Sequence, residues 1–349
     1  MKTISLVTTN KVSPRLDFMI KAALDNLPFE VIKSIDNVPD MRNKKLLFAV
    51  DLNEAGFNIP VLELFSKLWN KGPDSLSGSS AAFLIASPNE LHTKSSAQTL
   101  TLLANQLGCR FIGHPIMEAT KNLNNLLTWQ KSLNLSLEDS LFKLCSNLGR
   151  RLSDDNPTRV LKPKILALHS SSHKTSNTLL LWHMVKKHLT NCDIEEFHVE
   201  NGTVLDCIGC SYKTCKHYGK QSSCFYGGVM VEEIFPAIER ADATVWICPN
   251  YNDALSANLT AVINRMTALY RKAKFYNKTL FSIIVSGNSG SDTVARQLIG
   301  ALNINKGFRL PPYFSLMATA NDPGTVMLVD KIEDKACVFA DNIINEIKL

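Results

Sequence analysis

Short apolar runs alternate along the whole chain with longer stretches in which apolar residues recur every three or four positions. Short apolar runs bounded by turn residues are typical of buried strands, and the longer spacing is typical of one face of a helix. Their regular alternation predicts α/β layers around parallel sheets. In the C-terminal half, strands are expected at 164–169, 193–199, 243–248, 280–286 and 312–318, and helices at 177–190, 231–240, 256–272, 291–303 and up to Ile347.

The N-terminal half repeats this order, with expected strands at 4–8, 30–33, 46–50, 81–86 and 110–114. Five strands with intervening helices are typical of a flavodoxin-like, doubly wound sheet. The sequence therefore predicts an α/β protein of two tandem flavodoxin-like domains, each with a five-stranded parallel sheet. We place the domains at 1–150 and 164–349, joined by a polar linker with two prolines at 151–163.

The two halves also share internal spacings, which indicates a tandem duplication. Ser87 precedes Gly108 by 21 residues, and Ser286 precedes Gly307 by the same number. The first copy lacks the residues that would bind a ligand, because Pro14 stands near a helix start where a phosphate would need an N–H donor. A structural role or a subunit contact is therefore expected for residues 1–150.

Composition and charge restrict the class of protein. The formal net charge of +6 is mild, and no block of lysine or arginine resembles a nucleic-acid-binding arm, so no nucleic-acid partner is expected. The first residues read as a strand and not as a signal peptide, and no apolar run is long enough to cross a bilayer. A cytoplasmic protein without a membrane partner is therefore expected.

The segment from Ser170 to Thr178 reads Ser-Ser-Ser-His-Lys-Thr-Ser-Asn-Thr, between a predicted strand and a predicted helix. The first amides of a helix have no intrahelical partner, and the helix dipole favours an anion at that end. The segment adds hydroxyl donors at Ser170, Ser171, Ser176 and Thr178, and a positive charge at Lys174. It predicts a phosphate site, although a capped surface loop would have a similar composition.

Two further loops are expected beside this segment, because ligands of such sheets lie beyond the carboxyl ends of the strands. The loop after the third strand begins Pro249-Asn250-Tyr251-Asn252, and that after the fourth contains Gly287 and Asn288. The proline gives a fixed turn, the tyrosine offers an aromatic face, and the glycine lets the backbone approach a ligand closely. Together the three loops predict a site for a flat, phosphorylated ligand.

These residues carry a family resemblance that covers roughly 164–349. This half resembles the NADPH-dependent FMN reductase and iron–sulfur flavoprotein group of the flavodoxin-like superfamily. The phosphate loop of that group reads roughly G-S-P-R-x-x-G-N-T, at the nine positions from Ser170 to Thr178. A second shared segment runs from Cys-Ile-Gly-Cys at 207–210, through Ala-Asp at 241–242, to Pro-Asn-Tyr at 249–251 and a helix ending in Asn-Arg at 264–265.

The resemblance implies FMN as cofactor, with its phosphate held by Ser171, His173, Ser176, Asn177 and Thr178. Ser170 and Lys174 join this predicted set through their own hydroxyl group and charge. It places Pro249, Asn250, Tyr251 and Asn252 along the isoalloxazine ring, with Gly287 and Asn288 closing the other side. Two positions depart from the family pattern, since Ser170 replaces a glycine and His173 replaces an arginine. Lys174 and the helix N-terminus would then have to balance the negative charge of the phosphate.

Four of the nine cysteines, Cys207, Cys210, Cys215 and Cys224, form a cysteine-rich loop at 207–224. Four thiolates in one loop match the ligand demand of a [4Fe–4S] cluster, although the iron–sulfur flavoproteins use tighter spacing. Tetrahedral zinc tolerates the observed spacing, and unligated thiols are a third interpretation. The loop therefore predicts redox or metal chemistry without deciding which.

The resulting hypothesis is an FMN-dependent NAD(P)H oxidoreductase that passes electrons from a reduced nicotinamide to a small-molecule acceptor or a redox protein. Tyr251 is the candidate for contact with both flavin and substrate. One alternative is an iron–sulfur electron carrier without an organic substrate, and another is a non-catalytic interaction module with a zinc-stapled loop. Monomer and homodimer are both compatible with the sequence.

Overall fold

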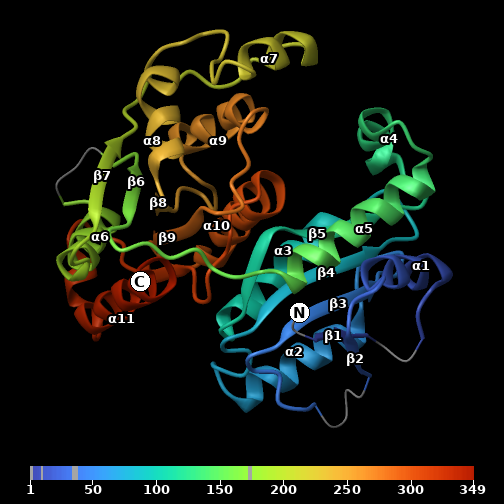
Figure 1. The fold of residues 1–349 in the computed structure, drawn as a ribbon. Coiled ribbons are helices and arrows are strands. Elements are labelled where there is room, and N and C mark those ends of the chain that lie inside the picture. The colour runs from blue at the N-terminus through green and yellow to red at the C-terminus, as the bar shows by residue number, and fades with distance from the viewer. Residues whose placement is uncertain (1–2, 9–10, 34–37, 172–174) are drawn as a thin grey trace. The chain divides into compact units, whose positions relative to one another are not determined.

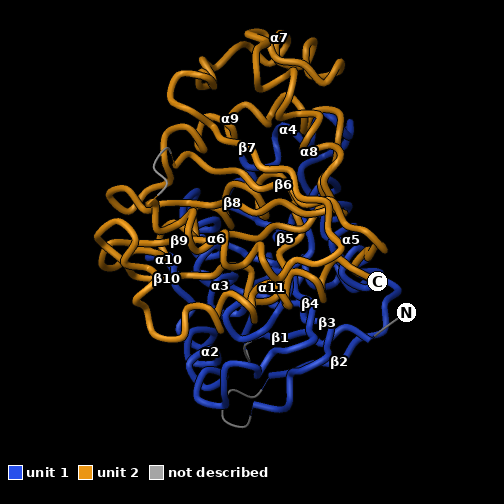
Figure 2. The backbone as a smooth tube through the Cα atoms, turned by 90° about the vertical axis from the view of Figure 1, so that its left-hand side faces the viewer, with its two compact units in different colours: residues 1–156 blue, residues 157–349 orange. Residues whose placement is uncertain are grey.

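The structure, a computed structural model, describes residues 3–8, 11–33, 38–171 and 175–349. The chain forms two compact units, residues 1–156 and 157–349 (Figure 2). The division falls inside the stretch predicted as a linker, and helix α5 (Leu137–Ser153) continues through the first residues of that stretch. Each unit is described by itself below.

The first unit contains one parallel sheet in the strand order β2-β1-β3-β4-β5 (Figure 1). Its strands are β1 (Ile4–Val7), β2 (Phe29–Ile32), β3 (Lys45–Asp51), β4 (Ser80–Ala86) and β5 (Arg110–Ala119). Its other helices are α1 (Pro14–Ala23), α2 (Ile59–Lys71), α3 (Thr93–Gln106) and α4 (Leu127–Leu133), the last preceded by a 3₁₀ turn (Asn124–Leu126). Strand β5 is longer than predicted and its pairing with β4 shifts register between Ala81 and Phe83, as at a β-bulge.

Apolar side chains that alternate along the strands fill both faces of this sheet. On one face, α1 and α5 pack against the sheet with residues such as Leu16, Leu141 and Leu84. The opposite face carries a row of stacked rings, with Phe83 lying 5.2 Å from Phe48 and 5.5 Å from the third ring, Phe111. Such aromatic contacts add to the burial of apolar area that stabilises the sheet.

The second unit repeats the topology, with the parallel order β10-β9-β8-β6-β7. Its strands are β6 (Lys164–His169), β7 (Asp193–His198), β8 (Ala243–Pro249), β9 (Thr279–Ser286) and β10 (Ser315–Thr319). Its helices are α6 (Asn177–His188), α7 (Tyr212–Gly219), α8 (Phe235–Arg240), α9 (Ala257–Tyr270), α10 (Ser291–Leu298) and α11 (Ile332–Ile347). A π-helical turn (Met230–Ile234) leads into α8, another (Ile299–Lys306) extends α10, and a 3₁₀ turn (Thr325–Leu328) precedes α11.

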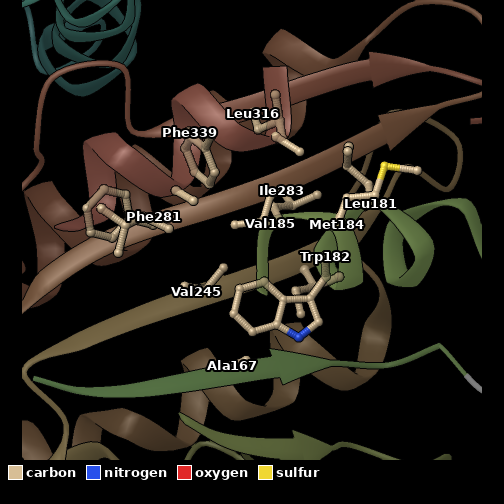
Figure 3. Packing of buried hydrophobic residues seen from close by; sticks show 14 of the residues in the cluster. Ala167, Leu181, Trp182, Met184, Val185, Val245, Phe281, Ile283, Leu316 and Phe339 are labelled. Atoms are coloured by element: carbon tan, nitrogen blue, oxygen red, sulfur yellow. The ribbon is translucent and has the colours of Figure 1, made fainter. Parts of the chain in front are cut away.

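The core of the second unit lies between its sheet and the helices α6 and α11. Trp182, Leu181 and Phe339 from these helices meet strand residues such as Val245 and Ile283 (Figure 3). The strand residues come from alternate positions, because successive side chains of a strand point to opposite faces. This packing holds the N-terminus of α6 at the carboxyl end of β6.

Both sheets have the flavodoxin order, in which the first two strands of the chain are exchanged and the rest follow in sequence. The predicted fold class is thus confirmed for each unit. The tandem duplication stays a prediction, since a shared topology does not establish a common origin. None of the helices in the described parts of the chain is both long and apolar enough to cross a lipid bilayer.

Candidate functional site

A cavity of about 700 Å³ opens at the carboxyl ends of the five strands of the second unit. The loops after β6, β7, β8, β9 and β10 all contribute to it, the loop after β7 through Asn201, together with the first turns of α6 and α9. From the predicted set it brings together Ser170, Ser171, Ser176, Asn177, Thr178, Pro249, Asn250, Tyr251 and Gly287. His173 and Lys174 lie outside the described residues.

The hydroxyl groups at the start of α6 form a closed cluster. The Ser176 Oγ donates to Ser171 Oγ at 3.0 Å and lies 2.9 Å from Thr178 Oγ1, which is 3.3 Å from Ser171 Oγ. Ser176 occupies the N-cap position, yet its side chain accepts no hydrogen bond from an amide of its own helix. This helix start therefore combines uncapped amides, hydroxyl donors and a positive dipole end, which are the elements of a phosphate site.

The corresponding helix start of the first unit is filled by the protein itself. Asp51, the last residue of β3, accepts hydrogen bonds from the Ser13 N–H at 2.6 Å and the Ser13 Oγ at 2.7 Å. Ser13 also caps α1 by accepting from the Leu16 N–H at 3.1 Å. An anion of the chain thus lies at this helix start, whereas no carboxylate is among the described residues that line the cavity at the start of α6.

We expect Asp51→Ala to loosen the start of α1, because charge-assisted hydrogen bonds contribute about 1.5–3 kcal/mol. Hydrogen exchange of α1 amides, followed by mass spectrometry, should accelerate about tenfold or more. Asp25→Ala, at an exposed position after the same helix, is the control and should leave exchange unchanged. Equal exchange in the two variants would contradict a capping role for Asp51.

The Asn177 side chain, unlike the hydroxyl groups of the phosphate loop, binds backbone groups of another loop. Its side-chain nitrogen donates to Ala320 O at 3.1 Å and Asp322 O at 2.9 Å, and its Oδ1 accepts from the Val326 N–H at 3.1 Å. The side chain therefore ties α6 to the loop after β10. Any contribution of Asn177 to phosphate binding would come from its backbone amide.

The loop after β8 makes a tight two-residue turn. Tyr251 and Ala254 exchange backbone hydrogen bonds, while Asn252 and Asp253 both have positive φ, as in a type I′ turn. This turn leaves the Tyr251 side chain 57% exposed at the edge of the cavity. An aromatic face in this position is suited to stacking on a planar ring.

Asn250 connects this loop to the loop after β9. Its Nδ2 donates to Ser286 Oγ at 2.9 Å and Ser289 O at 3.1 Å. Its Oδ1 is buried without a partner among the described residues, although buried polar atoms are generally paired. A donor group on a ligand in the cavity would satisfy this oxygen.

Asn252, Asn288 and Gly287 line a second, adjoining cavity of about 560 Å³, which also reaches Asn250. Gly287 belongs to both cavities, and a Cβ at this position would lie 2.7 Å from Asn321 Oδ1. The structure thus places two of the predicted cofactor residues, Asn252 and Asn288, in the second cavity and not in the first.

The sequence analysis did not identify several residues that line the first cavity. The loop after β10 contributes Ala320, Asn321 and Pro323, and the start of α9 contributes Ser256 and Asn258. The turn signal Asn-Asp-Pro-Gly at 321–324 marks the first loop, but a turn by itself does not indicate a site. Ser256 accepts from the Ser170 Oγ at 2.8 Å, a contact between residues 86 positions apart that no local pattern reveals.

The four clustered cysteines lie apart from this cavity, around a smaller one of about 160 Å³. Cys207 is exposed and Cys210, Cys215 and Cys224 are half-buried. Helix α7, which the sequence analysis did not predict, carries Cys215 through this region. Among the described residues, no three His, Cys, Asp or Glu side chains are arranged to hold a metal ion together.

Aromatic and cationic side chains complete the wall of this smaller cavity. The Tyr226 hydroxyl accepts from the Ile208 N–H at 2.9 Å and lies 3.6 Å from Cys210 Sγ. Arg265, only 4% exposed, stacks 5.0 Å from the Tyr226 ring and donates from Nη2 to Gly227 O at 2.8 Å. No carboxylate of the described chain forms an ion pair with it, so a buried positive charge faces the four thiols.

Residues 163–322 match the model of the NADPH-dependent FMN reductase family. The match confirms the resemblance indicated by the phosphate loop and the Pro-Asn-Tyr segment. The matched residues lie in the second unit, and the match indicates an NAD(P)H-dependent flavin oxidoreductase.

No curated protein matches the chain. Solved structures that resemble it include an NAD(P)H:quinone oxidoreductase from Methanothermobacter marburgensis, with 14% identity over 53% of this chain and 96% of its own (TM-score 0.41). An azoreductase from Bacillus anthracis str. Sterne shows 11% identity over 52% of this chain and 97% of its own (TM-score 0.36). An NADH:FMN oxidoreductase in its apo form shows 14% identity over 54% and 91% (TM-score 0.37). Sequence identities and TM-scores this low do not support a conclusion about activity.

Proposed function

We propose that the protein oxidises NADH or NADPH through a bound FMN and passes the electrons to a small-molecule acceptor or a redox protein. The observation that carries the proposal is the start of α6, whose N-cap side chain accepts no hydrogen bond from the helix amides, with its hydroxyl cluster, inside a cavity built from five loops. The equivalent start in the first unit is filled by Asp51. An external anion is therefore expected in the second unit alone.

The residues of the cavity fit FMN. Ser171, Ser176 and Thr178 would hold the phosphate with the first amides of α6, since these groups are all donors. The partnerless Asn250 Oδ1 would accept from an N–H of the flavin ring, and Tyr251 would cover a ring face. When bound, FMN supplies the hydride and electron chemistry.

The chain's own contribution is position and environment. None of the described residues around the cavity is charged, so orientation there rests on hydroxyl, amide and backbone groups. The exposed Tyr251 ring lies where the nicotinamide or the acceptor would approach the flavin, which makes it the candidate for contact with both. We assign no proton-transfer role, because the cavity wall holds no carboxylate or histidine among the described residues.

A flavin titration tests this proposal directly. Purified protein, freed of bound flavin, should quench the fluorescence of added FMN at one site per chain and then oxidise NADH or NADPH with a quinone or azo dye. The observed rate should depend on FMN. Protein that takes up no FMN would contradict the proposal, whatever its activity with other ligands.

A second candidate is an electron carrier with a [4Fe–4S] cluster at Cys207, Cys210, Cys215 and Cys224. The observation that favours it is the shared cavity of the four thiols beside the buried Arg265, which forms no ion pair with a described carboxylate. A metal site with four thiolates is negatively charged, and a negative charge would offset the cost of burying the guanidinium. The same reasoning applies to zinc, which would staple the loop without redox chemistry.

Metal and sulfide assays separate these cases. Anaerobically purified protein with roughly four irons and four sulfides per chain would support the electron carrier. One zinc without sulfide would support a stapled loop, and neither metal would leave free thiols. In each case the FMN titration is scored separately, because the two cavities have no lining residue in common.

A further inference from the structure

Two histidines stack on each other at the carboxyl ends of β6 and β7, next to the start of the phosphate loop at Ser170. His169 ends β6 and His198 ends β7, and the two residues are register partners in the sheet. Their rings are 4.7 Å apart and nearly parallel, at 7°. His169 is 8% exposed and also hydrogen-bonds the backbone of Ser171, so it contacts the phosphate loop itself.

Each ring keeps one buried nitrogen without a partner among the described residues: Nδ1 of His169 and Nε2 of His198. Leaving such atoms unpaired costs free energy, and buried exceptions call for a functional explanation. A ring nitrogen without a donor or acceptor is able to take up a proton without breaking an existing bond. Stacked imidazoles repel when both are charged, so the pair holds at most one added proton.

The surroundings of the pair are mixed in charge. From β7 and the residues after it, Glu196 and Glu200 face it, the latter 3.5 Å from His198 Nδ1. From α6 come His183 and Lys186, and Lys186 pairs with Glu196. Burial and the neighbouring His198 lower the pKa of His169, which favours the neutral form of this ring in the absence of a ligand.

We propose that the His169–His198 pair is a proton-binding element of the phosphate site, which becomes charged when a phosphate dianion occupies the loop above it. The proposal rests on the flavin function proposed above, and it assigns these histidines as residues that strengthen phosphate binding from below. The described residues that line the cavity include no cation.

The direction of the effect follows from linkage. A dianion attracts the imidazolium, so binding raises the pKa of the pair, and by reciprocity proton uptake tightens phosphate binding. Affinity for the dianion should therefore increase as the pH falls toward the pKa of the pair. A ligand without phosphate should show no such dependence.

The test is an NMR titration of histidine Cε1–H resonances in the full chain, without ligand, with FMN and with riboflavin, which lacks the phosphate. The two resonances are assigned with His169→Gln and His198→Phe, the second of which preserves ring stacking. FMN should raise the pKa of the pair by about one unit, equivalent to about tenfold in affinity. Riboflavin should leave it unchanged.

The resonance of His217, which is exposed on α7, serves as the internal control and should titrate identically in all three states. Bound FMN without a change in the pKa of either stacked histidine would overturn the inference and leave the flavin function standing. Failure to bind FMN would refute the flavin function instead. The same titration with inorganic phosphate then decides the inference, since a shift supports it and no shift overturns it.

Discussion

Thr178→Asp is expected to weaken FMN binding by at least a hundredfold while leaving riboflavin binding nearly unchanged. Thr178 is 2% exposed and belongs to the hydroxyl cluster at the start of α6. A carboxylate in this place would occupy the uncapped amides, as Asp51 occupies the start of α1 in the first unit. It would also repel the phosphate, and the positive end of the α6 dipole would offset part of the cost of burying the carboxylate.

Thr178→Val removes the hydroxyl without adding charge and should weaken FMN binding by about tenfold, as expected for one hydrogen bond to a charged group. Thr190→Val, at an exposed position beyond the other end of α6, should have no effect. The measurement is a fluorescence titration with FMN and riboflavin in parallel. An equal loss of both ligands in Thr178→Asp would mean that the variant damages the cavity and not the phosphate site.

Gly290→Ala should have the second large effect, on both stability and flavin binding. Gly290 has φ of +90°, and a Cβ there would lie 1.9 Å from Asp253 Oδ1 and 2.9 Å from Asn250 Nδ2. The substitution therefore strains the backbone and displaces the side chains of Asp253 and Asn250, the second of which connects the loops after β8 and β9. We expect a loss of about 2 kcal/mol or more in the free energy of unfolding, with FMN binding weakened at least tenfold.

Gly202→Ala is the matched control, since Gly202 has φ of +81° with open space around its Cβ position. The Gly202→Ala variant has the same kind of backbone strain, but its added Cβ meets no other atom. Denaturant unfolding of the second unit can be followed by tryptophan fluorescence, because Trp182 and Trp246 are buried there whereas Trp69 and Trp129, in the first unit, are half exposed. Equal losses in the two variants would show that displacement of the neighbouring side chains plays no part.

Much of the fold could be predicted because buried faces of strands and helices require apolar residues at regular spacings in the sequence. The strand predicted at 164–169 is β6 with the same bounds, and the other strands of the second unit differ by a few residues. The differences have local causes. The predicted strand at 312–318 begins only at Ser315, and prolines at 311 and 312 cannot donate to a ladder. Helix α7 was missed because its eight residues are mostly polar or aromatic, without a clear apolar stripe.

The candidate site was predictable where the groups that would bind a ligand are close together in the sequence. Ser171, Ser176 and Thr178 are neighbours in the sequence and lie together in the cavity. Asn177 shows the limit, since its side chain binds groups at 320, 322 and 326, over 140 positions away. FMN remains the proposed occupant, and the metal interpretation of the four cysteines remains open to the assays described above.

The sequence by itself determined the class of fold, the order of strands and helices, and the loops that carry donors, since each depends on neighbouring residues and short periodicities. Only the tertiary structure decided which groups meet across those loops. It placed Asp51 on Ser13, closing the first site, and left the α6 start open. It also stacked His169 on His198 and buried Arg265 beside the thiols. These contacts join residues that are distant along the chain, and their free energies depend on burial and distance, which no local pattern encodes.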